Sequence, residues 1–293
     1  MELLALRTFE AVVDEGGILA ASRKLNTVQS NVTNRIRRLE EELGTKLFFR
    51  SGRGVELAPA GRVLLDYARR MLSLERQTVA AVRQAGEDAG ELRIGAMETF
   101  TALYLPAVLR DLRHAHNTLE LHIRTDTSAV LIDKVLSRKL DCAFIAGPLR
   151  HPALQFDELT REELVQVFAP DTDPARCPLI LFREGCAYRA RALALQRTLG
   201  HVHNEAMEFG TLEGILGCVS VGLGWTLMPR RIVQQSSHAE RLALCEVPTD
   251  IGMVPTGMVY RKADMPPRLR DTLAQAVARI AGGTALPDRP AHG

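Results

Sequence analysis

The chain has 293 residues, of which 46% are hydrophobic and 25% charged, with a formal net charge of +2. At roughly 150 residues per domain, this length indicates about two domains with ample chain for hydrophobic cores. The composition excludes a disordered, collagen-like or disulfide-scaffold chain. No run approaches the roughly 18 consecutive apolar residues of a membrane span.

Cysteine usage and the N-terminus bear on the compartment. Five scattered cysteines form no CxxC pair, which argues for a reducing compartment and against a zinc site. Acidic residues follow Met1 too closely for a signal peptide. We therefore expect a cytoplasmic protein that has no membrane partner, no metal and no cofactor.

The first sixty residues predict three helices and two short strands. Helical periodicity covers about Leu3–Val13, a short helix follows from Leu19 to Leu25, and a longer one runs from about Gln29 to Leu43 and ends at Gly44. Residues 47–49 and 55–57 are expected to form two strands around a basic turn that contains Arg53. This order predicts a helix-turn-helix with a wing.

The longer helix has an apolar and a polar face. At 100° per residue, its apolar residues Val32, Ile36, Leu39 and Leu43 share one narrow face and should be buried. The opposite face carries short polar and basic side chains, which can hydrogen-bond to base edges in the major groove. Between positions 23 and 53 there are eight basic and three acidic residues, a local excess that suits phosphate contacts. We predict DNA contacts from Gln29, Ser30, Asn31, Thr33, Asn34, Arg37, Arg38 and Arg53.

These motifs resemble the winged helix-turn-helix of the LysR-type transcriptional regulators. The matching strings are Phe9-Glu10-Ala11-Val12, Ala21-Ser22-x-x-Leu25, Gln29-Ser30-Asn31-Val32-Thr33, Arg38-Leu39-Glu40-Glu41-Glu42-Leu43-Gly44, Leu47-Phe48-x-Arg50, Arg53 and Leu57-x-Pro59-Ala60-Gly61. The chain departs from the usual pattern at Val28, where the family has Ser, at Ser30-Asn31, and at Asn34, where Arg is common. The helix cap and the base preference should differ accordingly.

A long helix is predicted from Gly61 to about Gln84. Its residues Leu65, Ala68, Leu72, Glu75, Val79 and Val82 recur in steps of three and four, which indicates a heptad-like seam. We interpret this helix as a dimerisation element, and packing against its own wing is the alternative. In the resembling family it pairs two DNA-binding heads, which implies a dyad-symmetric site.

From about residue 91 strands and helices alternate, which predicts an α/β domain with a mainly parallel sheet. One set of strands is expected at 92–96, 119–123 and 141–145. A second is expected near 164–168, 178–182, 206–209 and 225–228, with a last strand at 257–260 returning to the first lobe. The strings Leu92-Arg93-Ile94-Gly95, Leu140-Asp141 and Gly222-Leu223-Gly224-Trp225-x-Leu227-x-Pro229 resemble the family's two-lobed effector domain, which is similar to periplasmic solute-binding proteins.

The fold class expected is therefore α/β with an N-terminal winged helix-turn-helix, a long linker helix and a two-lobed effector domain. We expect the DNA-binding domain at 1–61, the linker helix at 62–90 and a flexible tail at 282–293. The effector domain should span 91–281, with lobe 1 at about 91–147 and 255–281 and lobe 2 at about 148–254.

Three helix starts rich in hydroxyl groups follow predicted strands of this domain, where open α/β sheets bind ligands. They are Glu98-Thr99-Phe100-Thr101, Asp126-Thr127-Ser128 and Phe209-Gly210-Thr211. The resemblance implies that Thr99, Thr101, Thr127 and Thr211 line an effector pocket, and Ser128 and Phe209 join them from the strand ends. Glu98, Glu208 and Arg189 are further candidates: the acids favour an amine or amino acid, the arginine an organic acid.

The sequence thus predicts a transcriptional regulator and not an enzyme. Its expected partners are an operator in double-stranded DNA, a small-molecule effector and RNA polymerase. It is also expected to associate with further copies of itself, as a dimer or tetramer. Nucleotide-binding and zinc-protease motifs are absent from the sequence. Two alternatives stay open. One is a small-molecule carrier whose N-terminal helices serve assembly alone; the other is a hydrolase that uses Cys186 or Ser220.

Overall fold

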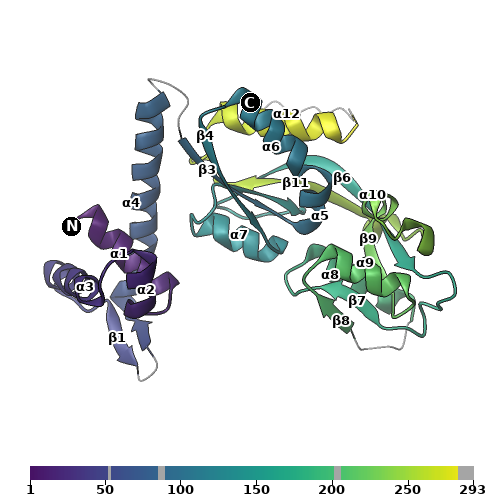
Figure 1. Cartoon of the computed structure of the whole chain (residues 1–293), viewed down its shortest axis with the longest axis horizontal. Helices are drawn as coiled ribbons and strands as arrows, with labels where there is room; N and C mark the ends of the chain where they lie inside the picture. Colours follow the sequence, from purple (N-terminus) through teal and green to yellow (C-terminus); the bar gives the residue numbers. More distant parts are fainter. Residues whose placement is uncertain (52–53, 85–89, 201–205, 283–293) are drawn as a thin grey trace. The chain divides into compact units, whose positions relative to one another are not determined.

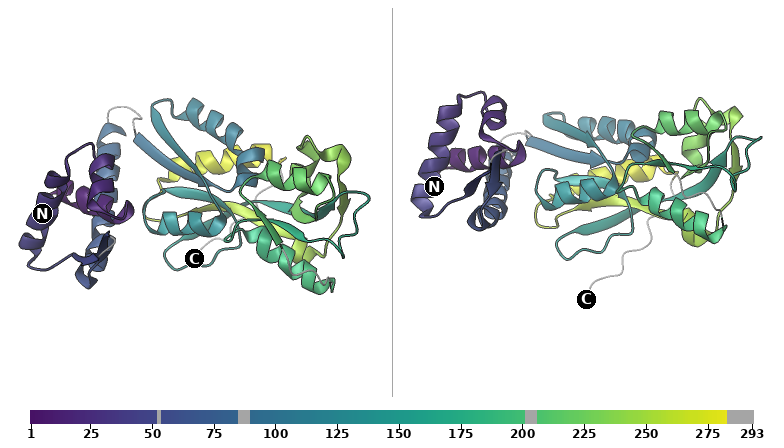
Figure 2. Two further views of the ribbon diagram at one scale, coloured as in Figure 1. Left: turned by 60° about the horizontal axis from the view of Figure 1, so that its bottom comes forward. Right: turned by 90° about the horizontal axis from the view of Figure 1, so that it is seen from below.

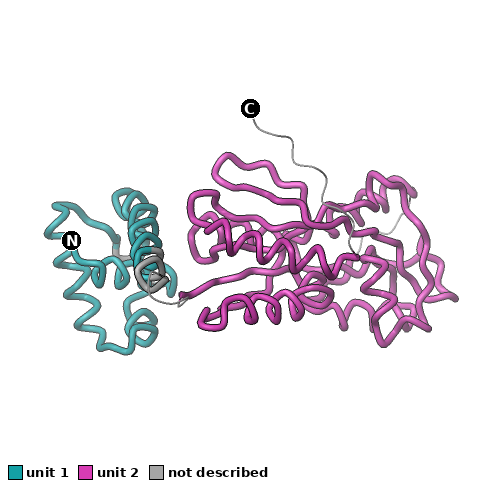
Figure 3. Tube along the Cα trace, turned by 90° about the horizontal axis from the view of Figure 1, so that it is seen from above, with its two compact units in different colours: residues 1–87 teal, residues 88–293 magenta. Residues whose placement is uncertain are grey.

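The computed structural model describes residues 1–51, 54–84, 90–200 and 206–282. The chain divides into two compact units, Met1–Glu87 and Asp88–Gly293 (Figure 3). Each unit has its own hydrophobic core. None of the helices in the described ranges combines the length and the apolarity that a bilayer crossing requires.

The first unit is a winged helix-turn-helix, as predicted (Figure 1). Its elements are α1 (Leu3–Asp14), α2 (Ile18–Lys24), α3 (Gln29–Leu43), β1 (Phe48–Ser51), β2 (Gly54–Leu57) and α4 (Pro59–Gln84). Strands β1 and β2 pair antiparallel. Helix α3 ends at Gly44, whose φ of 66° is the left-handed conformation that glycine adopts without strain.

Apolar faces of α1, α3 and α4 meet in the core of this unit, which contains Phe9, Val32 and Leu39. Leu43 is the exception to the predicted inward face of α3: it is 40% exposed, because the helix ends there beyond the core. Gly61 allows the first turn of α4 to approach the wing closely, since a Cβ at this position would lie 2.3 Å from the carbonyl oxygen of Leu47.

The burial of side chains along α4 differs from the seam that the sequence predicts. Ala68 and Leu72 are buried in the core of their own unit, and Glu75 accepts a hydrogen bond at 2.7 Å from Arg7 of α1. The first part of the predicted seam therefore packs against the head that precedes it, whereas Val79 of the same seam is 44% exposed. A different stripe of α4 is apolar and exposed in the chain described here; it consists of Val63, Tyr67, Met71 and Leu74. These four residues lie within an arc of roughly 80° at 100° per residue.

The second unit is an α/β domain whose predicted alternation of strands and helices is confirmed. Its first elements are β3 (Gly90–Ala96), α5 (Glu98–Leu103), α6 (Leu105–Ala115), β4 (Leu119–Thr125), α7 (Ser128–Leu136), β5 (Cys142–Ala146) and β6 (Gln155–Phe168). They are followed by β7 (Leu179–Phe182), α8 (Ala187–Thr198), β8 (Ala206–Phe209), α9 (Leu212–Ser220), β9 (Thr226–Pro229), α10 (Arg230–Gln235), a 3₁₀ turn η1 (Ala239–Arg241), β10 (Ala243–Cys245), α11 (Thr249–Gly252), β11 (Met253–Tyr260) and α12 (Pro267–Ile280).

One seven-stranded sheet passes through this unit in the order β10-β6-β11-β5-β3-β4, with β9 also paired to β6. The predicted mainly parallel sheet is found only in part, because β6 and β11 run between the lobes in opposite directions. Strand β3 is parallel to β4 and β5, whereas β11 is antiparallel to β5 and β6, and β6 is antiparallel to β9 and β10. Helices α6 and α12 lie together on one face of this sheet and α7 on the other (Figure 1). Strands β7 and β8 form a separate parallel pair.

The long strand β6 joins the two lobes. Residues 155–163 pair with β11 in lobe 1, and residues 164–168 pair with β9 and β10 in lobe 2. The sequence predicted only the second part, because charged residues hide the strand pattern before Leu164. Figure 2 shows the two lobes from two further directions. Lobe 1 is defined here by β3–β5, β11, α5–α7 and α12, and lobe 2 by β7–β10 and α8–α11.

Residues of the family strings have structural roles in this unit. The carboxylate of Asp141 accepts hydrogen bonds from the backbone N–H of Arg93 at 2.8 Å and from its guanidinium at 2.9 Å, so the pair fastens β3 beside β5. Trp225 is fully buried. A Cβ at Gly224 would lie 2.4 Å from the carbonyl oxygen of Pro178, so glycine is needed beside that tryptophan.

Candidate functional site

The first candidate site is the outer face of α3. The seven predicted DNA-contacting residues that the structure describes are all exposed; they are Gln29, Ser30, Asn31, Thr33, Asn34, Arg37 and Arg38. The eighth, Arg53, lies outside the described residues. Burial of Val32, Ile36 and Leu39 on the opposite face fixes the orientation of this helix. The polar face is therefore available to a partner, and its contact with DNA stays a prediction.

Local hydrogen bonds already engage part of this face. Asn31 donates to the hydroxyl of Thr27 at 3.1 Å, and Arg37 donates to the carboxylate of Glu41 at 2.9 Å. Within the described residues Ser30, Asn34 and Arg38 carry no such partner. Their side chains can make new hydrogen bonds without breaking old ones, whereas Arg37 must first leave Glu41.

The start of α3 has no side-chain cap. Its N-cap position is Val28, with extended backbone angles (φ −85°, ψ 151°), and the valine side chain accepts no hydrogen bond. The departure from the family pattern at Val28 thus leaves α3 without a side-chain cap. Asn26 instead adopts a positive φ of 48°, which tightens the turn between α2 and α3.

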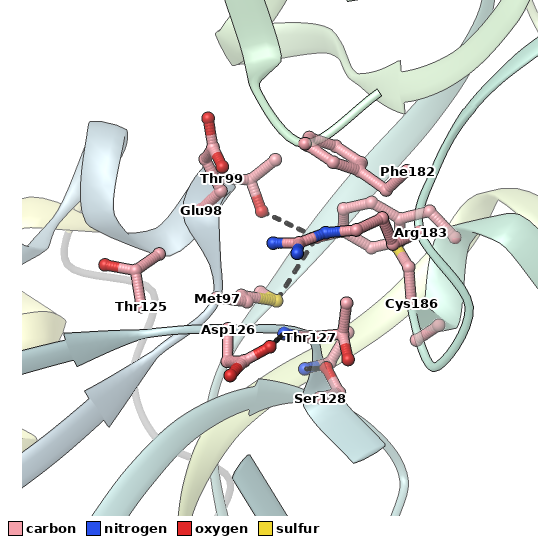
Figure 4. Close-up of a pocket in the computed structure, with 14 residues that line it drawn as sticks. Met97, Glu98, Thr99, Thr125, Asp126, Thr127, Ser128, Phe182, Arg183 and Cys186 are labelled. Atoms are coloured by element: carbon pink, nitrogen blue, oxygen red, sulfur yellow. Dashed lines mark hydrogen bonds between the residues drawn. The ribbon is translucent and has the colours of Figure 1, made fainter. Parts of the chain in front are cut away.

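The second candidate site is a cavity of about 250 Å³ between the lobes of the second unit (Figure 4). This size suits a small metabolite. Lobe 1 contributes residues from the starts of α5 and α7, and lobe 2 contributes the turn between β7 and α8 together with Gly210. The lining residues are Met97, Glu98, Thr99, Thr125, Asp126, Thr127, Ser128, Ala146, Phe182, Arg183, Cys186, Ala187, Tyr188 and Gly210.

Three of the six predicted effector residues line this cavity: Thr99, Thr127 and Ser128. The Thr99 hydroxyl lies 3.4 Å from that of Tyr188, and the Ser128 hydroxyl accepts a hydrogen bond from the Ala146 N–H at 3.3 Å. The hydroxyl oxygen of Thr127 is buried and has no hydrogen-bond partner in the structure. It faces Gly185, where an added Cβ would lie 2.7 Å from it, so it is a buried polar group in the wall of the cavity.

The other three predicted effector residues do not line the described cavity, because their side chains make contacts within their own elements or cores. Thr101 donates to the carbonyl oxygen of Met97 within α5, at 3.1 Å. Thr211 is the N-cap of α9 and accepts from the N–H of Gly214 at 3.2 Å. Phe209 packs in the core of lobe 2, among residues that include Ile215. Of this third predicted helix start, only Gly210 reaches the cavity.

Arg183 and Tyr188 are lining residues that the sequence did not single out. Figure 4 shows the Arg183 side chain extending into the cavity between Thr99 and Asp126. Arg183 follows strand β7 in a turn, where no periodicity marks the direction of a side chain. The one available signal was its position directly after a predicted strand, the same rule that identified Thr99 and Thr127.

Charge in the cavity is partly neutralised by the protein. Asp126 accepts hydrogen bonds from Lys134 at 2.8 Å and from the Thr127 N–H at 3.0 Å. Burial alone would raise the pKa of Asp126, but Lys134, the Thr127 N–H and Arg183 outweigh it and hold this pKa below its ordinary value. The carboxylate is therefore ionised at neutral pH and already paired.

The predicted candidates Arg189 and Glu208 do not line the cavity. They pair with each other at 2.8 Å, and Arg189 also donates to the carbonyl oxygen of Phe182. Cys186 does line the cavity, but burial raises the pKa of its thiol. Cys186 is therefore protonated at neutral pH and is no activated nucleophile.

The hydrolase alternative with Ser220 also lacks support. The Ser220 hydroxyl lies 3.5 Å from Nδ1 of His238, whose Nε2 contacts Glu213 at 2.7 Å. This order resembles a catalytic triad, but the hydroxyl donates to the Gly217 carbonyl oxygen at 2.8 Å, and Arg241 contacts the same His238 nitrogen at 2.8 Å. That nitrogen is not available as a base.

Among the described residues, no group of three or more metal-ligating side chains is placed to hold an ion.

Comparisons with known proteins agree with this arrangement. Residues 3–62 match the model of the bacterial regulatory helix-turn-helix protein of the lysR family, and residues 85–281 match the LysR substrate binding domain. The chain is 39% identical over 266 residues to YusT of Bacillus subtilis (strain 168), an uncharacterized HTH-type transcriptional regulator, covering 89% of this chain and 90% of YusT. It is 36% identical over 269 residues to the HTH-type transcriptional regulator GltR of the same organism, covering 89% and 91% of the two chains.

Solved structures show the same fold. A full-length OxyR variant from Pseudomonas aeruginosa has a TM-score of 0.71 at 23% identity and covers 99% of both chains. Full-length CbnR in complex with its target DNA has a TM-score of 0.65 at 23% identity, covering 96% of this chain and 100% of CbnR. The chain therefore belongs to the LysR family of transcriptional regulators, with a DNA-binding helix-turn-helix domain and an effector-binding domain.

Proposed function

We propose that this regulator binds an interrupted inverted repeat in DNA near a gene that it controls. The observation that carries this proposal is the exposed polar face of α3, on which Ser30, Asn34 and Arg38 have no partner within the described part of the chain. Asn can pair bidentately with adenine, Arg with guanine, and Ser with either. A two-fold symmetric dimer would place two such helices on two half-sites.

The proposed dimer contact is the exposed stripe on α4. Val63, Tyr67, Met71 and Leu74 form a row of apolar side chains on one face of a 26-residue helix. Monomeric proteins rarely leave such a row in water. We place the homodimer contact here, in place of the seam expected from the sequence, and a tetramer would need a second contact.

The proposed effector is an organic acid or an amino-acid-like metabolite bound between the lobes. Arg183 supplies a guanidinium for an anionic group. Apolar lining from Met97, Phe182 and Ala187 suits the carbon skeleton of such a ligand. An effector acts only through the difference between its affinities for two arrangements of the protein. In this proposal the two arrangements differ in the pose of the DNA-binding heads, and the change of pose alters the recruitment of RNA polymerase in the cytoplasm.

Footprinting on the DNA upstream of the protein's own gene tests this proposal. We expect a protected dyad whose extent changes with one compound from a panel of organic acids and amino acids. Arg53→Ala should weaken protection across sequences, and Asn34→Ala should mainly relax the base preference. Absence of protection at low salt, or indifference to both substitutions, would instead favour a carrier whose helices serve assembly.

A further inference from the structure

The side chain of Glu98 crosses the cleft between the lobes. Glu98 is the first residue of α5 in lobe 1, and its Oε1 accepts a hydrogen bond at 2.7 Å from the backbone N–H of Leu212, the first residue of α9 in lobe 2. The two residues are 114 positions apart in the sequence. A carboxylate of one lobe therefore binds the start of a helix in the other lobe.

The start of α9 is a place where an anion would otherwise bind. Free N–H groups and the helix dipole make such a terminus attractive for negative charge. In this chain the Leu212 N–H is taken by Glu98, and the Gly214 N–H is taken by the hydroxyl of Thr211. Gly210, which directly precedes this turn, lines the cavity. Glu98 thus fills an anion position beside the ligand cavity.

A second anion position in the cavity has no such occupant. Among the charged lining residues that the structure describes, Asp126 is paired with Lys134 and Glu98 is bound to α9. The Arg183 side chain has neither a hydrogen bond nor an ion pair in the same described set, and it lines the cavity. The positive charge left for a ligand is therefore that of Arg183.

We propose that Glu98 is a specificity-determining residue: it serves as a built-in anion at the α9 terminus, so that the cleft accepts an effector with one anionic group and rejects dicarboxylates of the same skeleton. This inference rests on the proposed effector site. A single carboxylate binds the Arg183 guanidinium. The second carboxylate of a diacid would meet the Glu98 carboxylate at an occupied helix terminus, and like charges repel there.

Matched pairs of ligands test the proposal on the full-length protein, by thermal shift and calorimetric titration. The probes are butanoate with butanedioate, pentanoate with pentanedioate, and benzoate with benzene-1,4-dicarboxylate. We expect at least one monocarboxylate to bind the unmodified protein and its diacid to bind at least tenfold more weakly. Glu98→Ala should bind that diacid at least tenfold more tightly than the unmodified protein does, and Arg183→Gln should lose the monocarboxylate.

Two further variants isolate the charge of Glu98. Glu98→Gln keeps an acceptor for the Leu212 N–H, so it should fold normally and still gain affinity for the diacid. Glu184→Gln is the matched control, since it removes one carboxylate from an exposed position next to Arg183 that does not line the cavity. It should leave the preference for monocarboxylates unchanged.

The proposal is overturned if both members of a pair bind the unmodified protein equally, if neither Glu98 variant gains diacid affinity, or if no monocarboxylate binds. Footprinting of the same proteins separates this result from the fate of the proposed DNA function. A protected operator with unselective ligand binding removes only the role of Glu98. Selective ligand binding without any protected DNA removes the operator proposal instead.

Discussion

The carboxylate of Glu40 and the backbone of Leu47 join helix α3 to the wing. Oε1 of Glu40 accepts from the N–H of Leu47 at 2.9 Å and from that of Phe48 at 3.4 Å, while Oε2 contacts Lys46 at 2.7 Å. Burial alone would raise the pKa of Glu40, but the hydrogen bonds from Lys46, Leu47 and Phe48 outweigh it and lower this pKa below its ordinary value of 4.5. One side chain thus positions the start of β1 relative to the helix that presents the polar face.

Glu40→Gln should loosen the wing in a pH-dependent way. A lowered pKa means that the Glu40 contribution is present above the unfolded value of about 4.5 and is lost as pH falls through the lower folded value. At pH 7 we expect a loss of about 1–2 kcal/mol. Hydrogen exchange at the Leu47 and Phe48 amides measures it. The variant and the parent should converge in acid, and equal protection at pH 7 would contradict the role of Glu40.

Val28→Ser should stabilise the helix-turn-helix unit. Val28 already has the backbone angles of an N-cap, is 60% exposed and provides no side-chain acceptor. A serine hydroxyl can accept from a free N–H in the first turn of α3, which is worth about 0.5–2 kcal/mol. Thermal unfolding should show a higher midpoint than in the parent. Val28→Ala, which removes the valine without adding an acceptor, should show no such gain.

Glu41→Gln should strengthen DNA binding. Glu41 holds Arg37 in an exposed i,i+4 pair at 2.9 Å, and its negative charge lies on the helix proposed to face DNA. Removing that charge frees Arg37, so we expect affinity to rise about threefold to tenfold at low salt and the gain to shrink at high salt. Titrations of operator DNA at two salt concentrations measure it. Glu120→Gln, which removes an exposed carboxylate from the second unit, should leave the affinity for operator DNA unchanged at both salt concentrations.

Tyr67→Glu should dissociate the proposed dimer. A carboxylate in the centre of the apolar stripe on α4 would be desolvated on association without a partner. Sedimentation analysis should show a shift towards monomer, and the footprint should weaken with it. Asp66→Lys, a charge change at an exposed neighbouring position, should leave the molecular mass of the assembly in solution unchanged. A dimer that survives Tyr67→Glu would place the contact elsewhere.

Thr127→Val should separate stability from ligand response. The Thr127 hydroxyl is buried without a partner, so replacing it by a methyl group should leave stability unchanged or raise it by up to about 1 kcal/mol. Effector affinity should stay within about twofold, because the hydroxyl oxygen is not accessible from the cavity. Thermal unfolding with and without the effector measures both quantities. A smaller ligand-induced shift in Thr127→Val would show that the hydroxyl turns towards a ligand.

Periodicity predicted the elements of the first unit well because burial there follows one helical face at a time. Val32, Ile36 and Leu39 are buried as their spacing predicts. For α4 the same rule could not tell which surface covers each apolar stripe, because periodicity shows only that residues share a face. Ala68 and Leu72 meet their own head, and the exposed stripe includes Tyr67.

The cavity was predictable only in part. The rule that ligands bind after strand ends pointed to Thr99 and Thr127, which line the cavity, and their contact with an effector stays a prediction. Thr211 does not line the described cavity, because its hydroxyl caps its own helix, and nothing local distinguishes a cap from a ligand contact. Arg183 could not be ranked, since the direction of a side chain in a turn depends on packing between distant segments.

The connection between the lobes limits how they can move. The chain enters lobe 2 along β6 at Glu163 and returns to lobe 1 along β11 at Met253, and these two residues are directly paired. Both crossings thus share a single rung of the ladder, and the bulge between Thr256 and Gly257 interrupts that ladder three residues further on. A rotation of one lobe relative to the other therefore has to twist these two paired strands, which continue into the sheet of lobe 1.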